Sequence, residues 1–133
     1  MKHYLIDTNI AIFYIKGKFD LKTKFDSLSI ENCFISEITL AELKFGVENS
    51  KSVEKNRIAL NKFLLGMNVL PILTCLDLYA KEKARLRKLG TPIADFDLLI
   101  GATAIVYNMV MVTNNTHHFD RINGINLEDW TKN

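Results

Sequence analysis

Short apolar runs alternate along the chain with longer segments in which apolar residues recur every three to four positions. The runs that predict strands are His3–Ile6, Cys33–Ile35, Val69–Pro71, Met109–Val112 and Ile125–Leu127. The segments that predict helices include Thr8–Ile15, Glu37–Glu48, Val53–Leu65, Leu76–Leu89 and Asp97–Tyr107. Strands that alternate with helices are typical of an α/β domain built on a parallel sheet.

Residues that break regular structure are few, so those present are informative. The chain has 6 glycines and 2 prolines. Gly90 and Pro92 end the basic helical segment, and Gly124 precedes the last predicted strand. No repeat or linker interrupts the pattern, and 133 residues suffice for one domain but not for two separate cores. The sequence therefore predicts a single domain over residues 1–133.

Composition and charge favour a folded domain without a broad nucleic-acid-binding surface. Hydrophobic residues make up 48% and charged residues 24%, near the average for globular domains. The formal net charge is only +2, so any RNA contact must come from a local patch. The basic segment 81–88 forms either a solvated helix face or a contact with an RNA backbone. We favour the solvated face, with Leu78, Leu86 and Leu89 turned inward and cations near the helix C-terminus.

Cysteine usage and hydropathy indicate a reduced, soluble, cytoplasmic protein. Cys33 and Cys75 lie within apolar stretches, in neither a disulfide framework nor a metal-ligand spacing. Asp7 interrupts the first apolar run, so no signal peptide fits. The longest apolar stretch, 98–112, is shorter than the ~20 residues that a membrane-spanning helix needs. We therefore expect no membrane association.

Polar side chains follow three of the predicted strands at the point where each strand ends. Asp7 follows the first strand, Ser36 follows the second, and Thr113 and Asn115 follow the fourth. The carboxyl ends of parallel strands meet at one edge of the sheet, where open α/β sheets place their sites. Asp97 begins a helix that leads into the fourth strand, so we expect it at the same edge.

Glu42 adds a further acid from the helix that follows Ser36. It lies about five residues into that helix, which at ~1.5 Å per residue is only ~8 Å from the sheet edge. Acids from distant parts of the chain thus converge, and carboxylates that repel one another require a cation. An all-oxygen set without cysteine favours Mg²⁺ or Mn²⁺ over Zn²⁺. Such an ion activates water and neutralises phosphodiester charge, so metal-assisted hydrolysis is the chemistry that fits.

These residues also have purely structural interpretations. Asp7 could N-cap the first helix, and Asp95 could cap the helix that begins at Asp97. The two polar residues after the fourth strand could belong to a turn. His117 and His118 lack the partner ligands of a zinc site, so we expect a loop or half-buried surface pair.

The polar positions and their neighbours together resemble one protein family. The segments that carry the resemblance are Tyr-Leu-Ile-Asp7-Thr8-Asn9-Ile, Ile-Ser36-Glu-Ile-Thr-Leu-Ala-Glu42-Leu-Lys-Phe-Gly46, Thr-Pro-Ile-Ala-Asp95-Phe-Asp97-Leu-Leu-Ile-Gly-Ala, Val-Thr113-Asn-Asn115-Thr and Leu-Glu-Asp-Trp130. This ordered set, which spans essentially the full length, resembles the PIN-domain ribonuclease toxins. The match is to the VapC-type toxins of type II toxin–antitoxin modules.

The resemblance implies a PIN-like three-layer sandwich with a central parallel β-sheet flanked by α-helices, which the five predicted strands fit. It also implies a Mg²⁺- or Mn²⁺-dependent endoribonuclease that acts on structured RNA such as tRNA or rRNA. Asp7, Glu42 and Asp97 match the acidic metal-binding positions of the family. Asn115 matches the fourth site position, where many members have Asp and others Asn.

Accessory roles follow from the same match. Thr8, Asn9, Ser36 and Thr113 resemble residues that orient the acids and the attacking water. Asp95 lies where members vary, so it either assists the site or is dispensable.

The resemblance further implies partners. Members pair with a VapB-like antitoxin, a DNA-binding protein whose C-terminal tail lies across the acidic cleft, often with a competing Arg. DNA is therefore expected only through the antitoxin, and a homodimer is usual. The apolar side chains of Phe45, Val47, Phe63, Leu64 and Met67 either offer surface for these contacts or pack in the core.

Two alternatives without nuclease activity compete with this function. A phospho-receiver domain needs an acidic pair after its first strand and a lysine after its last. Here the first strand is followed by Asp-Thr-Asn and the last by Glu-Asp-Trp, so neither requirement is met. A catalytically silent PIN domain would only bind RNA or protein, and the presence of all three acids argues against it.

Overall fold

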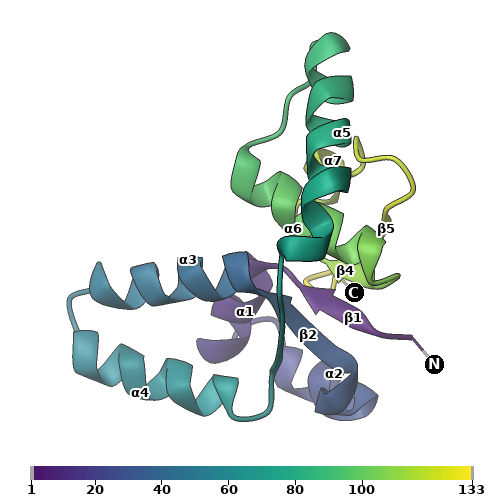
Figure 1. The fold of residues 1–133 in the computed structure, drawn as a ribbon. Helices are drawn as coiled ribbons and strands as arrows, with labels where there is room; N and C mark the ends of the chain where they lie inside the picture. The colour runs from purple at the N-terminus through teal and green to yellow at the C-terminus, as the bar shows by residue number, and fades with distance from the viewer. Residues whose placement is uncertain (1, 133) are drawn as a thin grey trace.

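Among residues 2–132, which the computed structural model describes, five parallel strands form one sheet in the order β3-β2-β1-β4-β5 (Figure 1). The strands are β1 (Tyr4–Ile6), β2 (Cys33–Ser36), β3 (Asn68–Leu70), β4 (Val110–Val112) and β5 (Asn126–Glu128). The helices are α1 (Thr8–Ile15), α2 (Leu21–Leu28), α3 (Glu37–Glu48), α4 (Val53–Leu64), α5 (Leu76–Lys88), α6 (Asp95–Val106) and α7 (Thr116–Phe119). Short 3-10 turns at Ile30–Asn32 and Leu73–Cys75 precede β2 and α5.

The predicted parallel α/β fold is confirmed, and each predicted strand is present with its ends shifted by no more than one residue. Helix α6 begins at Asp95, earlier than the predicted Asp97. Two helices were not predicted, α2 and the four-residue α7. Helix α2 has only eight residues, and Asp20 at its N-terminus makes no capping hydrogen bond through its side chain, so the sequence gives it no clear start.

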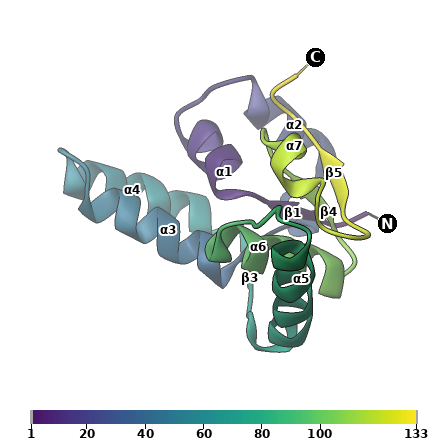
Figure 2. The same ribbon diagram turned by 90° about the horizontal axis from the view of Figure 1, so that it is seen from above.

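The sheet is covered on both faces, because successive side chains of a strand point to opposite sides. Tyr4 and Ile6 of β1 join a core formed with α1, α2, α3 and α4. Leu5, between them, joins a second core formed with α5, α6 and α7. Figure 2 shows α1 and α2 on one side of the strands and α5 and α6 on the other. This is the three-layer arrangement that the resemblance implied.

Helix α5 carries the basic segment and exposes most of its cations to solvent. Leu86 is buried and Leu78 is half-buried, as expected for the inner face. Leu89 was expected there too, but it is 62% exposed because it follows the last residue of the helix. The prediction for Leu89 is therefore wrong.

Glu82 occupies a buried position on α5 that the sequence analysis did not identify. Arg85 binds both of its carboxylate oxygens, at 2.9 and 2.7 Å. The backbone N–H of Asn123 donates to the same carboxylate at 3.1 Å. The pair therefore joins α5 to the segment before β5.

Replacing Glu82 with Gln is expected to lower the free energy of unfolding by about 2 kcal/mol at pH 7, because a charge-assisted pair is lost. Hydrogen bonds from Arg85 hold the pKa of the Glu82 carboxyl below its ordinary value. A lowered folded pKa stabilises the protein above the unfolded pKa, and this stabilisation is lost as pH falls through the folded pKa. Urea unfolding should therefore show a smaller difference in free energy of unfolding between the wild type and Glu82→Gln at pH 3 than at pH 7. An equal difference at pH 7 and pH 3 would contradict the role of the Glu82 charge. Glu54→Gln, which changes an exposed carboxylate, is the control.

The apolar side chains expected either at an interface or in the core divide between surface and core. Phe63 and Met67 are buried, so they do not offer a docking surface. Val47 is also largely buried, but it lines a groove next to α3. Leu64 is half-buried. Phe45 is 68% exposed on α3 and is the member of this set that remains available for contact.

Both cysteines are buried and free. Burial raises the pKa of the Cys33 thiol to about 11, which makes it unreactive at neutral pH.

Over the described range, no helix combines the length and the hydrophobicity that a bilayer crossing demands.

Candidate active site

Asp7 lies at the carboxyl end of β1 and caps α1. Its Oδ1 accepts a hydrogen bond from the Thr8 backbone N–H, and its Oδ2 accepts one from the Thr113 hydroxyl, both at 2.8 Å. The residue is only 5% exposed. Burial raises the pKa of Asp7 to about 6; the two hydrogen bonds oppose this rise, and the charges of Asp97 and Glu42 add to it. One side chain therefore both caps a helix and lies within the field of the other acids.

Glu42 lies half-buried on α3 and is bound to α1 through Thr8. The Thr8 hydroxyl donates to Glu42 Oε1 at 2.6 Å and forms a second hydrogen bond with the buried Thr39 at 3.1 Å. Ser36 begins the helix, because its hydroxyl accepts from the Ile38 backbone N–H at 3.0 Å. Ser36 thus caps the helix that carries Glu42. Its side chain forms this capping hydrogen bond and, within the described residues, none with an acid of the site.

Asp97 lies in the first turn of α6, where the helix dipole favours negative charge. Its Oδ2 is 3.2 Å from Nε2 of His118 on α7. His117 is exposed, but His118 is half-buried and contacts an acid of the site, which the sequence analysis did not predict. The signal that the sequence offered was its position three residues after the candidate site residue Asn115.

Of the remaining predicted site residues, Thr113 forms a hydrogen bond with an acid directly, and Asn115 and Asn9 form none within the described range. The Thr113 hydroxyl donates to Asp7 and accepts from the Asn115 backbone N–H at 3.0 Å. Asn115 is exposed and enters this network through its backbone. Asn9 is exposed on α1, and its side chain makes no hydrogen bond with any other residue between 2 and 132.

Asp95 does not cap α6, since it is the first helical residue and Ala94 holds the N-cap position. The Lys83 ammonium and the Tyr79 hydroxyl of α5 both donate to Asp95 Oδ1 at 2.8 Å. Asp95 therefore joins α6 to α5, and its carboxylate is bound on that side.

Asp7 lies within the field of Glu42 and Asp97, but the three acids do not form a finished metal site. In the part of the chain that the structure describes, no group of three His, Cys, Asp or Glu is arranged to hold an ion. Within the same range, no Lys or Arg forms an ion pair with Asp7, Glu42 or Asp97. Carboxylate oxygens without a cationic partner suit a hard divalent ion in charge and donor type. Such an ion would require these side chains to converge.

Replacing Thr113 with Val is expected to lower the free energy of unfolding by about 2 kcal/mol at pH 8, because the buried Asp7 carboxylate loses a donor. Thr113→Ser keeps the hydroxyl and should lose less than half of that amount. Urea unfolding of both variants in EDTA measures the difference. Equal losses in the two variants would mean that the hydroxyl does not support Asp7.

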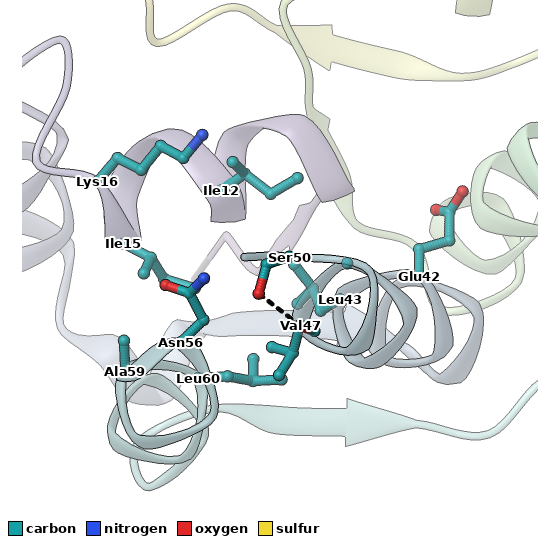
Figure 3. A pocket seen from close by; sticks show the side chains of 11 residues that line it. Ile12, Ile15, Lys16, Glu42, Leu43, Val47, Ser50, Asn56, Ala59 and Leu60 are labelled. Carbon is teal, nitrogen blue, oxygen red and sulfur yellow. Dashed lines mark hydrogen bonds between the residues drawn. The ribbon is translucent and has the colours of Figure 1, made fainter. Parts of the chain in front are cut away.

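A groove of about 310 Å³ lies between α1, α3 and α4 (Figure 3). Its lining is mainly apolar and includes Ile12, Ile15, Leu43, Val47, Ala59 and Leu60. Glu42 stands at one end and Lys16 at the other. The groove is therefore an apolar surface with one of the three acids, Glu42, at its end.

Comparison with known proteins identifies the class to which this fold and site belong. Residues 4–125 match the PIN domain model, and the chain belongs to the PIN domain family. The curated relatives to which it is similar include VapC proteins. It is 36% identical over 131 residues to tRNA(fMet)-specific endonuclease VapC of Salmonella typhimurium, covering 98% of this chain and 99% of that protein. It is also 36% identical over 132 residues to ribonuclease VapC2 of Rickettsia felis, covering 97% and 98%.

The solved structures agree with this assignment. DNA-bound VapBC from Salmonella typhimurium contains a chain that matches with a TM-score of 0.90 and 34% identity, covering 98% of this chain and 99% of that one. These matches confirm the PIN-like fold and the resemblance to VapC-type proteins. They support a ribonuclease rather than a phospho-receiver domain, in keeping with the Asp129-Trp130 pair that follows β5.

Proposed function

We propose that this protein is a VapC-type toxin, a metal-dependent endoribonuclease that hydrolyses phosphodiester bonds in structured RNA such as tRNA or rRNA. The observation that carries the proposal is that buried Asp7, at the end of β1, lies within the field of Glu42 on α3 and Asp97 on α6. None of these three acids has a Lys or Arg counter-ion among residues 2–132. Relatives named as a tRNA-specific endonuclease and a ribonuclease support RNA as the substrate. The proposal takes residues 1–133 as a single cytoplasmic PIN domain.

Each site residue has a chemical role in this proposal. Asp7, Glu42 and Asp97 would hold Mg²⁺ or Mn²⁺, with Asn115 at a fourth position. When bound, the ion supplies a water of lowered pKa and neutralises charge on the phosphodiester. The hydroxyls of Thr8 and Thr113 hold two of the carboxylates in place by donating to them.

A VapB-like antitoxin is the proposed partner. The similar chain from Salmonella typhimurium was solved in a VapBC complex bound to DNA. The groove between α1, α3 and α4 offers an apolar seat that ends at Glu42, where an Arg of the partner would compete for the carboxylate. DNA contact is assigned to the antitoxin, because this chain has a net charge of only +2. Exposed Phe45 is available to the antitoxin or to a second copy in a homodimer.

Cleavage of total tRNA by the purified protein in Mg²⁺ tests the proposal. We expect cleavage by the wild type, and we expect it to disappear with EDTA and with Asp7→Ala. Asp26→Ala, which removes an exposed carboxylate on α2, is the matched control and should cleave normally. RNA left equally intact by wild type and Asp7→Ala would make the protein a silent PIN domain and end the proposal.

A further inference from the structure

His118 connects Asp97 to a guanidinium on the other side of its imidazole ring. His118 Nε2 lies 3.2 Å from Asp97 Oδ2, and His118 Nδ1 lies 2.7 Å from Arg121 Nη2. The side chains of His118 and Asp97 are 22% and 37% exposed, so water competes only in part for these contacts. The result is a continuous chain of carboxylate, imidazole and guanidinium.

Arg121 determines which ring nitrogen of His118 carries the proton. A guanidinium has N–H donors and no acceptor, so Nδ1 of His118 must accept the hydrogen bond. The proton of the neutral ring is then on Nε2, and that N–H donates to Asp97 Oδ2. A proton on Nδ1 would face the N–H groups of Arg121 and would break the contact at 2.7 Å.

Arg121 is itself held in place by backbone carbonyls. Its Nε donates to the carbonyl of His118 at 3.2 Å. Its Nη1 donates to the carbonyls of Thr91 at 3.3 Å and Pro92 at 3.0 Å, in the loop between α5 and α6. Its own carbonyl accepts from Arg85 of α5 at 2.8 Å. The guanidinium is therefore fixed relative to both α6 and α7.

The hydrogen bond between His118 and Asp97 corresponds to the side-chain hydrogen bonds that the other two acids accept. Asp7 and Glu42 each accept a hydrogen bond from a threonine hydroxyl. Asp97 accepts from an imidazole instead, and its Oδ1 has no side-chain partner among the described residues. Each of the three carboxylates thus has an oxygen held by the side chain of a Thr or His, and Asp7 accepts a further hydrogen bond from the Thr8 backbone N–H.

We propose that His118, held in its Nε2–H tautomer by Arg121, is the positioning residue for Asp97. It holds Oδ2 and so fixes the orientation in which Oδ1 is presented to a divalent cation. The inference rests on the proposed function, because it treats Asp97 as a metal ligand. Loss of a residue that orients a ligand typically weakens metal affinity by about 10- to 100-fold.

Nitrogen NMR of the imidazole in the full-length, metal-free protein tests the tautomer. The ¹⁵N shifts of His118 should show a protonated Nε2 and a bare Nδ1 in the wild type. In Arg121→Met, the two tautomers should become mixed. A protonated Nδ1 in the wild type overturns the inference without any reference to metal or RNA.

Titration with Mn²⁺, followed by electron paramagnetic resonance, tests the positioning role. We expect His118→Leu to weaken Mn²⁺ affinity by at least about tenfold. His118→Gln, whose amide N–H replaces Nε2–H, should stay within about threefold of the wild type. His117→Leu, at the exposed neighbour, is the matched control and should bind as the wild type does. Thermal unfolding of each variant shows whether it is folded.

The outcomes separate this inference from the proposed function. Affinity unchanged in His118→Leu, while Asp97→Asn abolishes Mn²⁺ binding, overturns the positioning role and leaves the metal site standing. Equal losses in His118→Leu and His118→Gln overturn it too, since the donor would not matter. A wild type that binds no Mn²⁺ contradicts the metal site itself, and the NMR result still decides the tautomer.

Discussion

Replacing Asp7 with Asn is expected to abolish RNA cleavage and, at the same time, to stabilise the metal-free protein. Burial raises the pKa of Asp7 from 3.8 to about 6, so the folded state resists its ionisation. A raised folded pKa means that stability falls as pH rises from about 4 to about 6 and stays low above it. At ~1.4 kcal/mol per pKa unit, the neutral Asn should stabilise the fold by about 2–3 kcal/mol at pH 8. The difference should nearly disappear at pH 4.

Thermal and urea unfolding in EDTA at pH 8 and pH 4 measure this effect, and tRNA cleavage in Mg²⁺ measures the activity. Asp95→Asn is the control for stability, because that carboxylate is exposed and paired with Lys83. Asp95→Asn should show no such gain at pH 8. A lower unfolding temperature for Asp7→Asn at pH 8 would mean that the side chain serves mainly as a helix cap.

Adding Mn²⁺ is expected to stabilise the wild type markedly, and removing it with EDTA should stop cleavage completely. The charges of Glu42 and Asp97 disfavour the ionised form of Asp7, and no Lys or Arg in the described range forms an ion pair with these three acids. A cation that binds only the folded state at 100 times its dissociation constant adds about 2.7 kcal/mol. We therefore expect a rise of several degrees in the unfolding temperature.

The same titration of Asp97→Asn identifies the site of this effect. That variant should gain little from Mn²⁺ and should not cleave tRNA. Asp26→Asn removes an exposed acid that is paired with Lys22, so it should respond as the wild type does. Cleavage that persists in EDTA, or an equal gain in Asp97→Asn, would contradict metal binding by these acids.

The central elements of the fold were predictable because their local patterns are strong. The three central strands, β1, β2 and β4, are short continuous apolar runs that are largely buried, and α1 and α3 begin at the capping residues Asp7 and Ser36. Helix α2 was missed because it is short and no capping side chain marks its start. The start of α6 was misplaced because Ala94, rather than a capping side chain, precedes it.

The candidate site was predictable in part. Asp7 and Thr113 follow strands that lie next to each other, so the parallel topology predicts their proximity. The link from Thr8 to Glu42 depends on how α1 packs against α3, which no local pattern expresses. His118 resembled a surface histidine in the sequence, because its contact with Asp97 depends on where α7 lies relative to α6.

The amino-acid sequence by itself determined the α/β class, the strand ends at which polar residues gather, and the acids offered for a metal. Those properties depend on local periodicity and on the geometry that all parallel sheets share. The tertiary structure decided the hydrogen-bond partner of each acid, the burial of Glu82 and the role available to His118. These depend on packing between helices far apart in the chain, where differences of an ångström decide whether two polar atoms form a hydrogen bond.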